Sequence, residues 1–379
     1  MRVTIPELSL VLLIGPSGSG KSAFAARHFR PSEVLSLDAV RRMIADEDKD
    51  EGAVEAGWGA LLELAARRMN WGRLTVIDAD LTLAARRQAL LELAAELHFI
   101  PSAFVFAAGA GQDTLDSEGF RRIFRFGSRE EIAAAEIQRL PLWSNRQDET
   151  GPFDIVSSVH GRCDELLELL RKLGYRLEPS IGHPRGRKLV FLGDLVDHGP
   201  RNADVLRLVM SAVDAGAGYS VPGNHDARLV RWLRGDETRT DGGMAATRAE
   251  FDQATAEFRQ QVETFLESSV SHYLFDGGNL VVAHAGLAAS LQGRGSAAVR
   301  AFAVNGDAPG EDESERTESA PNWAIEYQGA PRVVYSHPAV SEPLWLNQTV
   351  NLNTRGRLTA LRYPEMQIVS VPAGEFAIE

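Results

Sequence analysis

Two kinds of phosphate-handling residues follow one another in this sequence of 379 residues. The first kind is a glycine-rich run that reads Gly15-Pro16-Ser17-Gly18-Ser19-Gly20-Lys21-Ser22. Glycines let backbone N–H groups close around phosphate oxygens, a lysine at this spacing reaches the terminal phosphates, and the next hydroxyl holds Mg²⁺. The run therefore predicts a site for ATP and Mg²⁺, formed by Gly15, Ser17, Gly18, Ser19, Gly20, Lys21 and Ser22.

Two carboxylates stand where they could assist phosphoryl transfer. Asp78 closes an apolar run at 74–77, the position of an acidic residue that helps to hold the metal, with a turn residue at the strand end as the less favoured alternative. Asp38 ends a second short apolar run, where a carboxylate could accept the proton of an attacking hydroxyl. Asp38 and Arg41 could also be a helix N-cap and a surface pair, and the pattern leaves both alternatives open.

The second kind of residue is a series of typical metal ligands. The series runs through Val159-His160-Gly161, Gly193-Asp194-Leu195-Val196-Asp197, Gly223-Asn224-His225-Asp226, His284 and His337. In phosphoesterases, two divalent ions bridged by one carboxylate activate a water molecule and clamp the phosphate oxygens. One chain thus carries residues for adding a phosphate and for removing one.

The elements that must position these residues alternate between strands and helices. In the first part we expect strands at 8–14, 74–77 and 101–106 and helices at 22–29, 54–68 and 81–97, which together predict a mostly parallel sheet. A charged stretch from about 112 to 139 is expected to be helical. A polar segment at 145–152 ends in Gly-Pro and divides the chain into domains 1–148 and 153–379.

In the second part, the metal-type motifs follow predicted strands. We expect strands at 153–156, 188–192, 219–221, 280–283 and 332–335, and alternating antiparallel strands at 350–352, 358–363 and 367–371. Ligands at the ends of successive strands are how α/β sheets build sites. The fold class is therefore α/β in both domains.

Composition narrows the classes of function. The formal net charge of −12 argues against a general electrostatic grip on nucleic acid, although a local basic groove around 121–125 would remain compatible with it. The single cysteine, Cys163, allows no internal disulfide and fits a reducing compartment. The apolar stretch 8–14 is too short to span a bilayer and lacks the flanks of a signal peptide. We expect a cytoplasmic protein without a membrane segment.

Several of these motifs resemble those of one family, the bacterial polynucleotide kinase-phosphatases of RNA repair. The resemblance is carried by Ser36-Leu37-Asp38 with Arg41, by 74–79, by 122–127, by the metal-type motifs, by Asn322-Trp323-Ala324 and by 358–365. It implies an N-terminal P-loop kinase domain and a C-terminal calcineurin-like metallophosphoesterase sandwich. The implied activity is ATP-dependent phosphorylation of 5′-hydroxyl polynucleotide ends, RNA first and DNA as the other substrate.

The resemblance also implies roles for individual residues. Asp38 would be the general base, Arg41 would contact the acceptor phosphate, and Arg122 and Arg125 would be lid arginines over the donor phosphates. In the second domain Asp194 would bridge two ions and His225 would donate a proton to the leaving group. One ion would be held by Asp194, Asn224, His284 and His337, and the other by His160, Asp194 and an aspartate two residues before His160.

Three positions depart from that family pattern. Ser158 replaces the expected aspartate, His198 replaces a phosphate-binding arginine, and Asn353 replaces a later aspartate. A neutral hydroxyl replaces a hard anionic ligand poorly. We therefore expect at most one tightly bound Mn²⁺ or Ni²⁺ and a weakened or inactive 3′-end phosphatase, with a rearranged but active centre as the alternative.

Other functions compete with this interpretation. The metal-type motifs also suit protein phosphatases and diadenosine tetraphosphate hydrolases, which we rank lower because those families lack the leading kinase. A nucleotide-binding scaffold in an RNA repair or defence complex, or a small-molecule kinase, would explain the glycine-rich loop. Because no adenylation motif follows the final strands, we expect an oligomeric assembly with a separate RNA ligase and, as a further candidate, an RNA-end methyltransferase.

Overall fold

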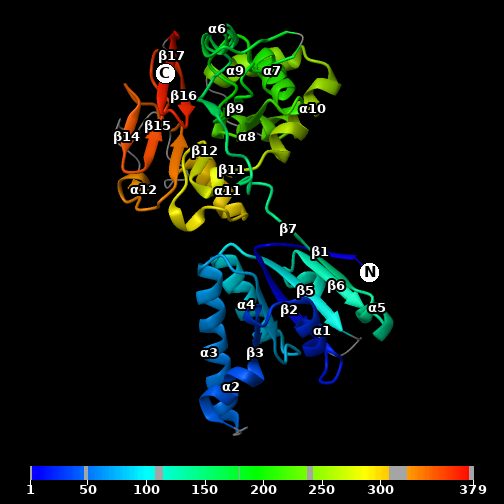
Figure 1. Ribbon diagram of the computed structural model, residues 1–379. Coiled ribbons are helices and arrows are strands. Elements are labelled where there is room, and N and C mark those ends of the chain that lie inside the picture. The colour runs from blue at the N-terminus through cyan, green and yellow to red at the C-terminus, as the bar shows by residue number, and fades with distance from the viewer. Residues whose placement is uncertain are drawn as a thin grey trace. The chain divides into compact units, whose positions relative to one another are not determined.

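Figure 1 shows a computed structural model of the chain, which describes residues 2–46, 50–106, 114–178, 180–236, 242–306 and 322–374. The chain divides into two compact units, Met1–Leu142 with Arg294–Ser296 and Trp143–Gly293 with Ala297–Glu379. The sequence places the boundary later, within 149–152. The division comes earlier because backbone hydrogen bonds join Ser144 and Arg146 to Leu274 and so attach this segment to the second unit.

The first unit is built on a five-stranded parallel sheet in the order β3–β4–β2–β5–β6. Its strands are β2 (Ser9–Ile14), β3 (Val34–Ser36), β4 (Thr75–Asp78), β5 (Ile100–Phe106) and β6 (Arg122–Phe126). Its helices are α1 (Lys21–His28), α2 (Leu37–Ala45), α3 (Glu51–Asn70), α4 (Ala84–Glu96) and α5 (Arg129–Ala133). A separate parallel pair is formed by β1 (Arg2–Pro6) and β7 (Glu136–Leu140).

Strand β2 is the centre of the first core because it is buried on both faces. Leu10 and Leu12 join an apolar cluster with residues of α3 and α4. Val11 and Leu13 pack instead with Phe24 of α1. Helices therefore cover both sides of the sheet, as its near-continuous apolar strands require, and the carboxyl ends of the strands open onto one common edge.

The predicted helix from about 112 to 139 is wrong. Apart from 112–113, which lie outside the described residues, the segment forms a 3-10 turn (Leu115–Ser117), the strands β6 and β7 and the short α5 between them, joined by irregular connections. Phe124 and Phe126 explain the difference, because their rings pack 5.3 Å from that of Phe104 and 5.2 Å from that of Phe106 on β5. Tertiary packing against the sheet thus overrides the helical propensity of the charged positions.

The second unit is a sandwich of two five-stranded sheets, in the orders β10–β9–β8–β16–β17 and β11–β12–β13–β15–β14. The first sheet contains β8 (Phe153–Val156), β9 (Lys188–Phe191), β10 (Gly218–Ser220), β16 (Arg357–Tyr363) and β17 (Gln367–Pro372). The second contains β11 (His272–Phe275), β12 (Leu280–Ala283), β13 (Arg332–Tyr335), β14 (Leu344–Leu346) and β15 (Thr349–Asn351). Its helices are α6 (Cys163–Leu173), α7 (Asn202–Asp214), α8 (Asn224–Leu233), α9 (Gly242–Asp252), α10 (Ala256–Ser268), α11 (Ala297–Asn305) and α12 (Asn322–Ile325).

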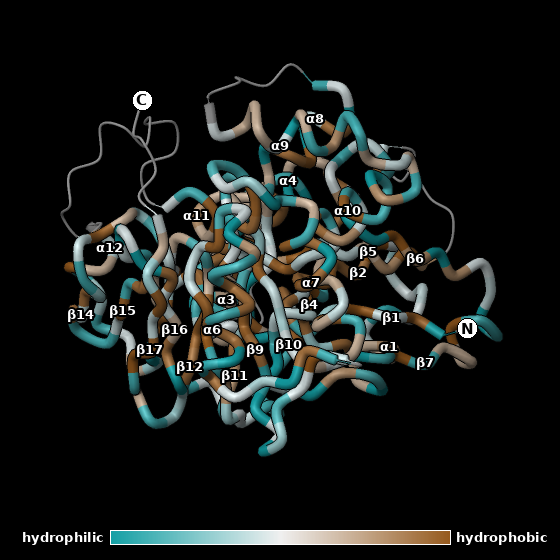
Figure 2. Tube along the Cα trace, turned by 90° about the horizontal axis from the view of Figure 1, so that it is seen from above, coloured by the Kyte–Doolittle hydropathy of each residue, from teal (hydrophilic) through white to brown (hydrophobic). Residues whose placement is uncertain are grey.

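Three apolar layers hold the sandwich together. Phe153 and Ile155 of β8 meet Phe275 and Leu280 of the other sheet in the central layer. Helices α6, α7 and α8 cover the outer face of the first sheet, and α11 and α12 cover that of the second. Figure 2 shows the same pattern along the trace, where strands such as β12 are apolar throughout and helices such as α3 mix apolar and polar positions. The expected α/β sandwich is confirmed.

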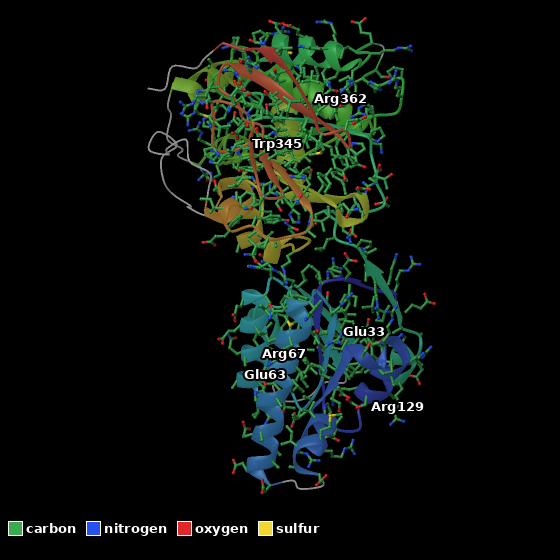
Figure 3. The ribbon with its side chains drawn as sticks, turned by 60° about the vertical axis from the view of Figure 1, so that its left-hand side comes forward. Glu33, Glu63, Arg67, Arg129, Trp345 and Arg362 are labelled. Carbon is green, nitrogen blue, oxygen red and sulfur yellow. The ribbon has the colours of Figure 1, made fainter. Side chains whose placement is uncertain are left out.

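A buried ion cluster fixes strand β8 ahead of the first metal-type motif. The fully buried carboxylate of Asp154 accepts hydrogen bonds from Arg187 Nε at 3.1 and 3.0 Å. Arg362 of β16 (Figure 3) brings its Nε within 3.4 Å of the same carboxylate. Removing either partner would leave a buried charge uncompensated, so this cluster constrains the register of β8 against β16.

Candidate functional site

The glycine-rich loop joins β2 to α1 at the carboxyl edge of the first sheet. Gly18 and Gly20 have φ of 77° and 97°, in the left-handed region that glycine adopts without strain. A side chain at Gly15 would lie 2.4 Å from the carbonyl oxygen of Phe106, so the close approach to β5 also requires glycine. Gly20 is the N-cap of α1 and offers no side chain to the first backbone N–H groups of the helix. These N–H groups can receive a phosphate.

The side chains of the loop also fit a nucleotide. Lys21 Nζ donates to the carbonyl oxygens of Gly15 and Pro16 at 2.6 and 2.8 Å. Ser19 Oγ is buried without a hydrogen-bond partner among the described residues, a state that a bound ligand would relieve. The remaining predicted positions with clear exposure are Ser17, Gly18 and Ser22.

The parallel register brings the two predicted carboxylates to this loop. Ser36 of β3 pairs with Asp78 of β4, and Asp78 pairs with Leu13 of β2, two residues before the loop begins. Asp38 follows in the first turn of α2 and is exposed. The N-cap of α2 is Ser36, whose hydroxyl accepts from the N–H of Ala39 at 3.4 Å. Asp38 is therefore not the cap, and its carboxylate faces solvent at the loop edge.

Arg41 is buried, so Asp38 and Arg41 are not the surface pair that was one of the two alternatives from the sequence. Arg41 is only 6% exposed. A side chain on Gly57 of α3 would lie 3.1 Å from Arg41 Cβ, so the two helices meet closely at this point. A contact between Arg41 and an acceptor phosphate stays a prediction.

A carboxylate that the sequence reasoning missed lies within electrostatic reach of Lys21. Asp80 accepts hydrogen bonds from the hydroxyl and the backbone N–H of Thr82 at 2.7 and 3.1 Å. These hydrogen bonds lower the pKa of Asp80, and the charges of Arg86 and Lys21 add to the effect. The available signal was the second aspartate in the sequence Asp78-Ala79-Asp80.

The two predicted lid arginines lie on the edge strand β6. Arg125 pairs with Val105, which pairs with the last residue of β2, so Arg125 lies at the loop end of the sheet. It forms a 2.8 Å ion pair with Asp116 on the surface. Arg122 lies three residues earlier, and its guanidinium donates to the carbonyl oxygen of Thr4 at 2.8 Å. Of the two, Arg125 lies nearer the glycine-rich loop, and a contact of either arginine with donor phosphates stays a prediction.

In the second unit, Asp194 ties together the loops that carry the metal-type motifs. Its carbonyl oxygen accepts the N–H groups of Val159 and His160 at 2.9 and 2.8 Å. Its Oδ1 accepts the N–H of His225 at 3.1 Å. A side chain on Gly223 would lie 2.1 Å from that Oδ1, which explains the glycine in the third motif. Asp194 itself has a φ of 47°, a strained conformation that is often found at functional sites.

The four donors predicted for one ion lie together. Ligand atoms of Asp194, His284 and His337 all fall within 4.8 Å of one another, and the three residues are buried. Asn224 Oδ1 lies 3.0 Å from His284 Nε2, and His284 Nδ1 donates to the carbonyl oxygen of Leu192 at 2.8 Å. A carboxylate, an amide oxygen and two imidazoles suit a divalent transition ion, so these residues fit one.

The charges of this centre support the same conclusion. Burial raises the pKa of Asp194, but the neighbouring histidines, His284 foremost, hold it well below its ordinary value. Burial lowers the pKa of His284, but the carboxylate of Asp194, 3.2 Å away, raises it above its ordinary value. A cation that binds this pair would release the proton of His284.

The hydroxyl and the N–H of Ser158 both contact Ser336. Its N–H donates to Ser336 Oγ at 2.7 Å, and its hydroxyl lies 3.1 Å from the carbonyl oxygen and 3.0 Å from the hydroxyl of Ser336. Weak binding of a second ion at this position stays a prediction. Asn353 is held through its backbone, since its N–H donates to Asn351 Oδ1 and its carbonyl oxygen accepts from Val340.

Asp197 orients the predicted proton donor, a role that the sequence reasoning did not assign. Its Oδ2 lies 2.7 Å from His225 Nδ1 and 2.6 Å from the guanidinium of Arg228, and its Oδ1 accepts from Thr247 at 2.6 Å. Burial raises the pKa of Asp197, but these hydrogen bonds, His225 first, lower it to about 2. An ionised carboxylate only accepts hydrogen bonds, so Asp197 favours a proton on His225 Nδ1, whereas the guanidinium of Arg228, 2.9 Å from the same nitrogen, favours a lone pair there. The sequence signal for this role was the position of Asp197 at the end of the second motif, Gly193 to Asp197.

His198 forms a triangle with two other histidines. The ring centroids of His160, His198 and His225 are separated by 5.1, 5.0 and 5.2 Å. One ligand nitrogen of each lies within 4.8 Å of the others. The ring of His198 rests on Gly243 of α9, where an added side chain would lie 2.7 Å from Nδ1. The structure thus gathers His160 with His198 and His225 rather than with a second carboxylate beside Asp194.

Among the described residues, no helix combines the length and the apolar character needed to cross a membrane.

Comparison with known proteins separates the two units. Residues 10–113 match a family model described as an AAA domain, and residues 151–337 match that of the calcineurin-like phosphoesterases. The chain is 39% identical to the bis(5′-nucleosyl)-tetraphosphatase PrpE of Anoxybacillus flavithermus and 38% identical to that of Bacillus subtilis, each over 230 residues. Both alignments cover 58% of this chain and 94% of the relative. A solved structure provisionally described as a diadenosine tetraphosphatase shares 25% identity and a TM-score of 0.42, over 61% of this chain and 97% of its own.

Proposed function

Because the chain belongs to the calcineurin-like phosphoesterase family and carries an AAA-type unit ahead of that domain, we propose that it adds phosphate with its first unit and removes phosphate with its second. The first unit transfers the γ-phosphate of ATP to the 5′-hydroxyl end of a polynucleotide, RNA in the first place. The second unit hydrolyses a phosphate ester or anhydride at the centre around Asp194.

One observation carries the first part of the proposal. The register of β3, β4 and β2 places Asp38, Asp78 and the glycine-rich loop on one edge of one sheet. The N–H groups at the start of α1 hold the phosphates, and Lys21 turns from the carbonyl of Gly15 toward them. Asp38 accepts the proton of the attacking hydroxyl while that oxygen bonds to the γ-phosphorus and ADP leaves. Mg²⁺ bound with ATP would offset the negative charge of the phosphates.

The choice of a polynucleotide acceptor rests on the resemblance carried by Ser36-Leu37-Asp38 with Arg41. The experiment supplies Mg²⁺, γ-labelled ATP and a 5′-hydroxyl RNA or DNA oligonucleotide, with a free nucleoside as the small-molecule acceptor. We expect label at the 5′ end of the oligonucleotide and its loss in Lys21→Ala and Asp38→Asn. The matched control is Glu63→Gln, because Glu63 is an exposed carboxylate on α3 (Figure 3) that pairs only weakly with Arg67.

Each other outcome points to another function. Label on the nucleoside alone would replace the polynucleotide kinase with a small-molecule kinase. ATP binding or hydrolysis without transfer to any acceptor would overturn the kinase and favour the nucleotide-binding scaffold.

For the second unit, a second candidate substrate is favoured by the relatives. These relatives are named bis(5′-nucleosyl)-tetraphosphatases, and they match this chain over 94% of their own length at 38–39% identity. The donor set of Asp194, Asn224, His284 and His337 supports metal-assisted hydrolysis there, and the similarity to these relatives favours a dinucleoside tetraphosphate over 3′-phosphate ends as the substrate. The assay compares both substrates with Mn²⁺, Ni²⁺ or Zn²⁺, using Asp194→Asn as the inactive reference. Turnover of 3′-phosphate ends alone would reverse this preference.

A further inference from the structure

The three histidines around His198 come from three separate loops yet converge. His160 follows β8, His198 follows β9 and His225 lies in the first turn of α8. Their ring centroids are nearly equidistant, at 5.0–5.2 Å, and a ligand nitrogen from each lies within 4.8 Å of the others. Such convergence of imidazoles from different elements is what a metal site requires.

We propose that His160, His198 and His225 form a metal site with nitrogen donors only, which takes Zn²⁺ or a similar borderline ion. This site would take the place of the second ion site of the family pattern, in which Ser158 stands where an aspartate would bind the ion. Tetrahedral zinc with bonds of about 2.0–2.1 Å keeps its ligand nitrogens about 3.3–3.4 Å apart. The rings must therefore close by at most about 1.5 Å, a movement within the reach of side-chain rotation.

The partners of the rings prepare two of the nitrogens for a metal. His160 Nδ1 lies 3.2 Å from the carbonyl oxygen of Val196, and His225 Nδ1 lies 2.7 Å from Asp197. An Nδ1–H that donates to a carbonyl or carboxylate leaves the lone pair on Nε2, which is the usual arrangement around metal-bound histidine. Thr247 and Arg228 donate hydrogen bonds to Asp197, so the carboxylate that orients His225 is itself held in position.

The third ring is positioned by packing. Gly243 of α9 lies against His198, and a methyl group there would come within 2.7 Å of Nδ1 and 2.8 Å of Cε1. His198 also has a φ of 64°, which turns the residue out of the regular strand path. Gly243 thus leaves the space that the imidazole occupies.

The donor atoms decide which ion this site prefers. Three neutral imidazoles suit Zn²⁺, Ni²⁺ or Cu²⁺ much better than Mg²⁺ or Mn²⁺. The neighbouring centre contains the carboxylate of Asp194 and the amide of Asn224, and it accepts harder ions. Two adjacent centres would therefore differ in metal preference. In this arrangement His225 is a ligand and not the proton donor that the resemblance implied.

The inference concerns metal binding alone and depends on neither proposed activity. The test strips the full chain with a chelator and titrates it with Zn²⁺ against a chromophoric competitor, with the metal content of the dialysed protein measured by mass spectrometry. We expect two bound Zn²⁺ ions in the unchanged chain. His198→Gln and Gly243→Ala should each lose one ion, with at least about 100-fold weaker binding at that site for the ligand substitution.

Matched variants separate the two centres. His337→Ala should weaken the Asp194 centre and leave the nitrogen site, whose bound Co²⁺ would still show the intense visible absorption of tetrahedral coordination. His183→Gln, a histidine outside both clusters, should keep both ions. Retention of one ion by His198→Gln also shows that the unit remains folded. A single Zn²⁺ in the unchanged chain, or two unaffected ions in both His198→Gln and Gly243→Ala, would refute the nitrogen site.

Discussion

Ser158→Asp restores the carboxylate that the metal centre lacks, and its effect on stability can be worked out from the contacts of Ser158. The serine is 4% exposed, and its hydroxyl and N–H bind only Ser336 among the contacts described above. An aspartate there breaks the two hydroxyl contacts, each worth about 0.5–1.5 kcal/mol. It also buries an anion, and an unpaired buried charge costs about 3–5 kcal/mol.

The metal-free variant should therefore lose about 4–8 kcal/mol, of which the new charge is the larger part. For a unit of this size about 1 kcal/mol lowers Tm by roughly 2–4 °C, so the loss corresponds to roughly 8–32 °C. A divalent ion that pairs with the new carboxylate offsets the part of this loss that comes from the unpaired charge. An ion present at 1,000 times its Kd contributes about 4.1 kcal/mol.

Thermal unfolding with chelator and with Mn²⁺ measures both effects. We expect Ser158→Asp to be much less stable than the unchanged chain in chelator and to gain more from Mn²⁺ than the unchanged chain does. Ser158→Asn is the matched control, because it removes the hydroxyl without adding a charge and should gain nothing extra. An equal response to Mn²⁺ in the aspartate and asparagine variants would refute the reasoning that position 158 faces a cation site.

Two further predictions concern stability. Burial lowers the pKa of His272 to about 4, and its Nε2 accepts the N–H of Gly293 at 3.1 Å. Since the folded pKa lies below the ordinary 6.5, the contribution of neutral His272 to the free energy of unfolding is complete above pH 6.5 and should fall by about 3 kcal/mol toward pH 4. Urea titrations in chelator should show a weaker dependence of the free energy of unfolding on pH in His272→Gln. Glu118 holds the fully buried guanidinium of Arg87 with hydrogen bonds of 2.5 and 2.7 Å. Glu118→Ala leaves that charge uncompensated and should cost the first unit about 3–5 kcal/mol in urea unfolding, whereas Glu63→Ala should cost less than about 1 kcal/mol; equal losses in the two variants would contradict this account.

Local sequence patterns predicted the elements whose burial is uniform. Strand β12 is apolar at every position because it is covered on both faces, and its predicted limits at 280–283 are those observed. The glycine-rich loop was predictable because Gly15, Gly18 and Gly20 each meet a steric or conformational demand that other residues fail. Such positions carry their structural reason in the residue type itself.

Contacts between distant segments were not predictable from the sequence. The two charged residues of strand β6, Arg122 and Arg125, are three positions apart, a spacing typical of a helix, and only the pairing with β5 makes the segment a strand. Ser158 meets Ser336, which is 178 positions away, so no local pattern could show where its hydroxyl points. From the sequence, His198 could be interpreted only as the replacement of a phosphate-binding arginine. Its neighbours His160, His225 and Gly243 come together only in the folded unit.

The position of Asp194 also bears on how the second unit acquires its ions. Its carbonyl oxygen accepts hydrogen bonds from the loop of His160, and its Oδ1 accepts one from the start of α8. These hydrogen bonds hold both segments in position without a metal ion. The loops that carry the ligands are therefore in place before any ion arrives, and metal uptake requires side-chain rotation but neither refolding nor loop closure. Exchange should then proceed at the rate at which ligands are exchanged around the ion. The metal content of the protein would follow the ions in its surroundings rather than those present at its synthesis.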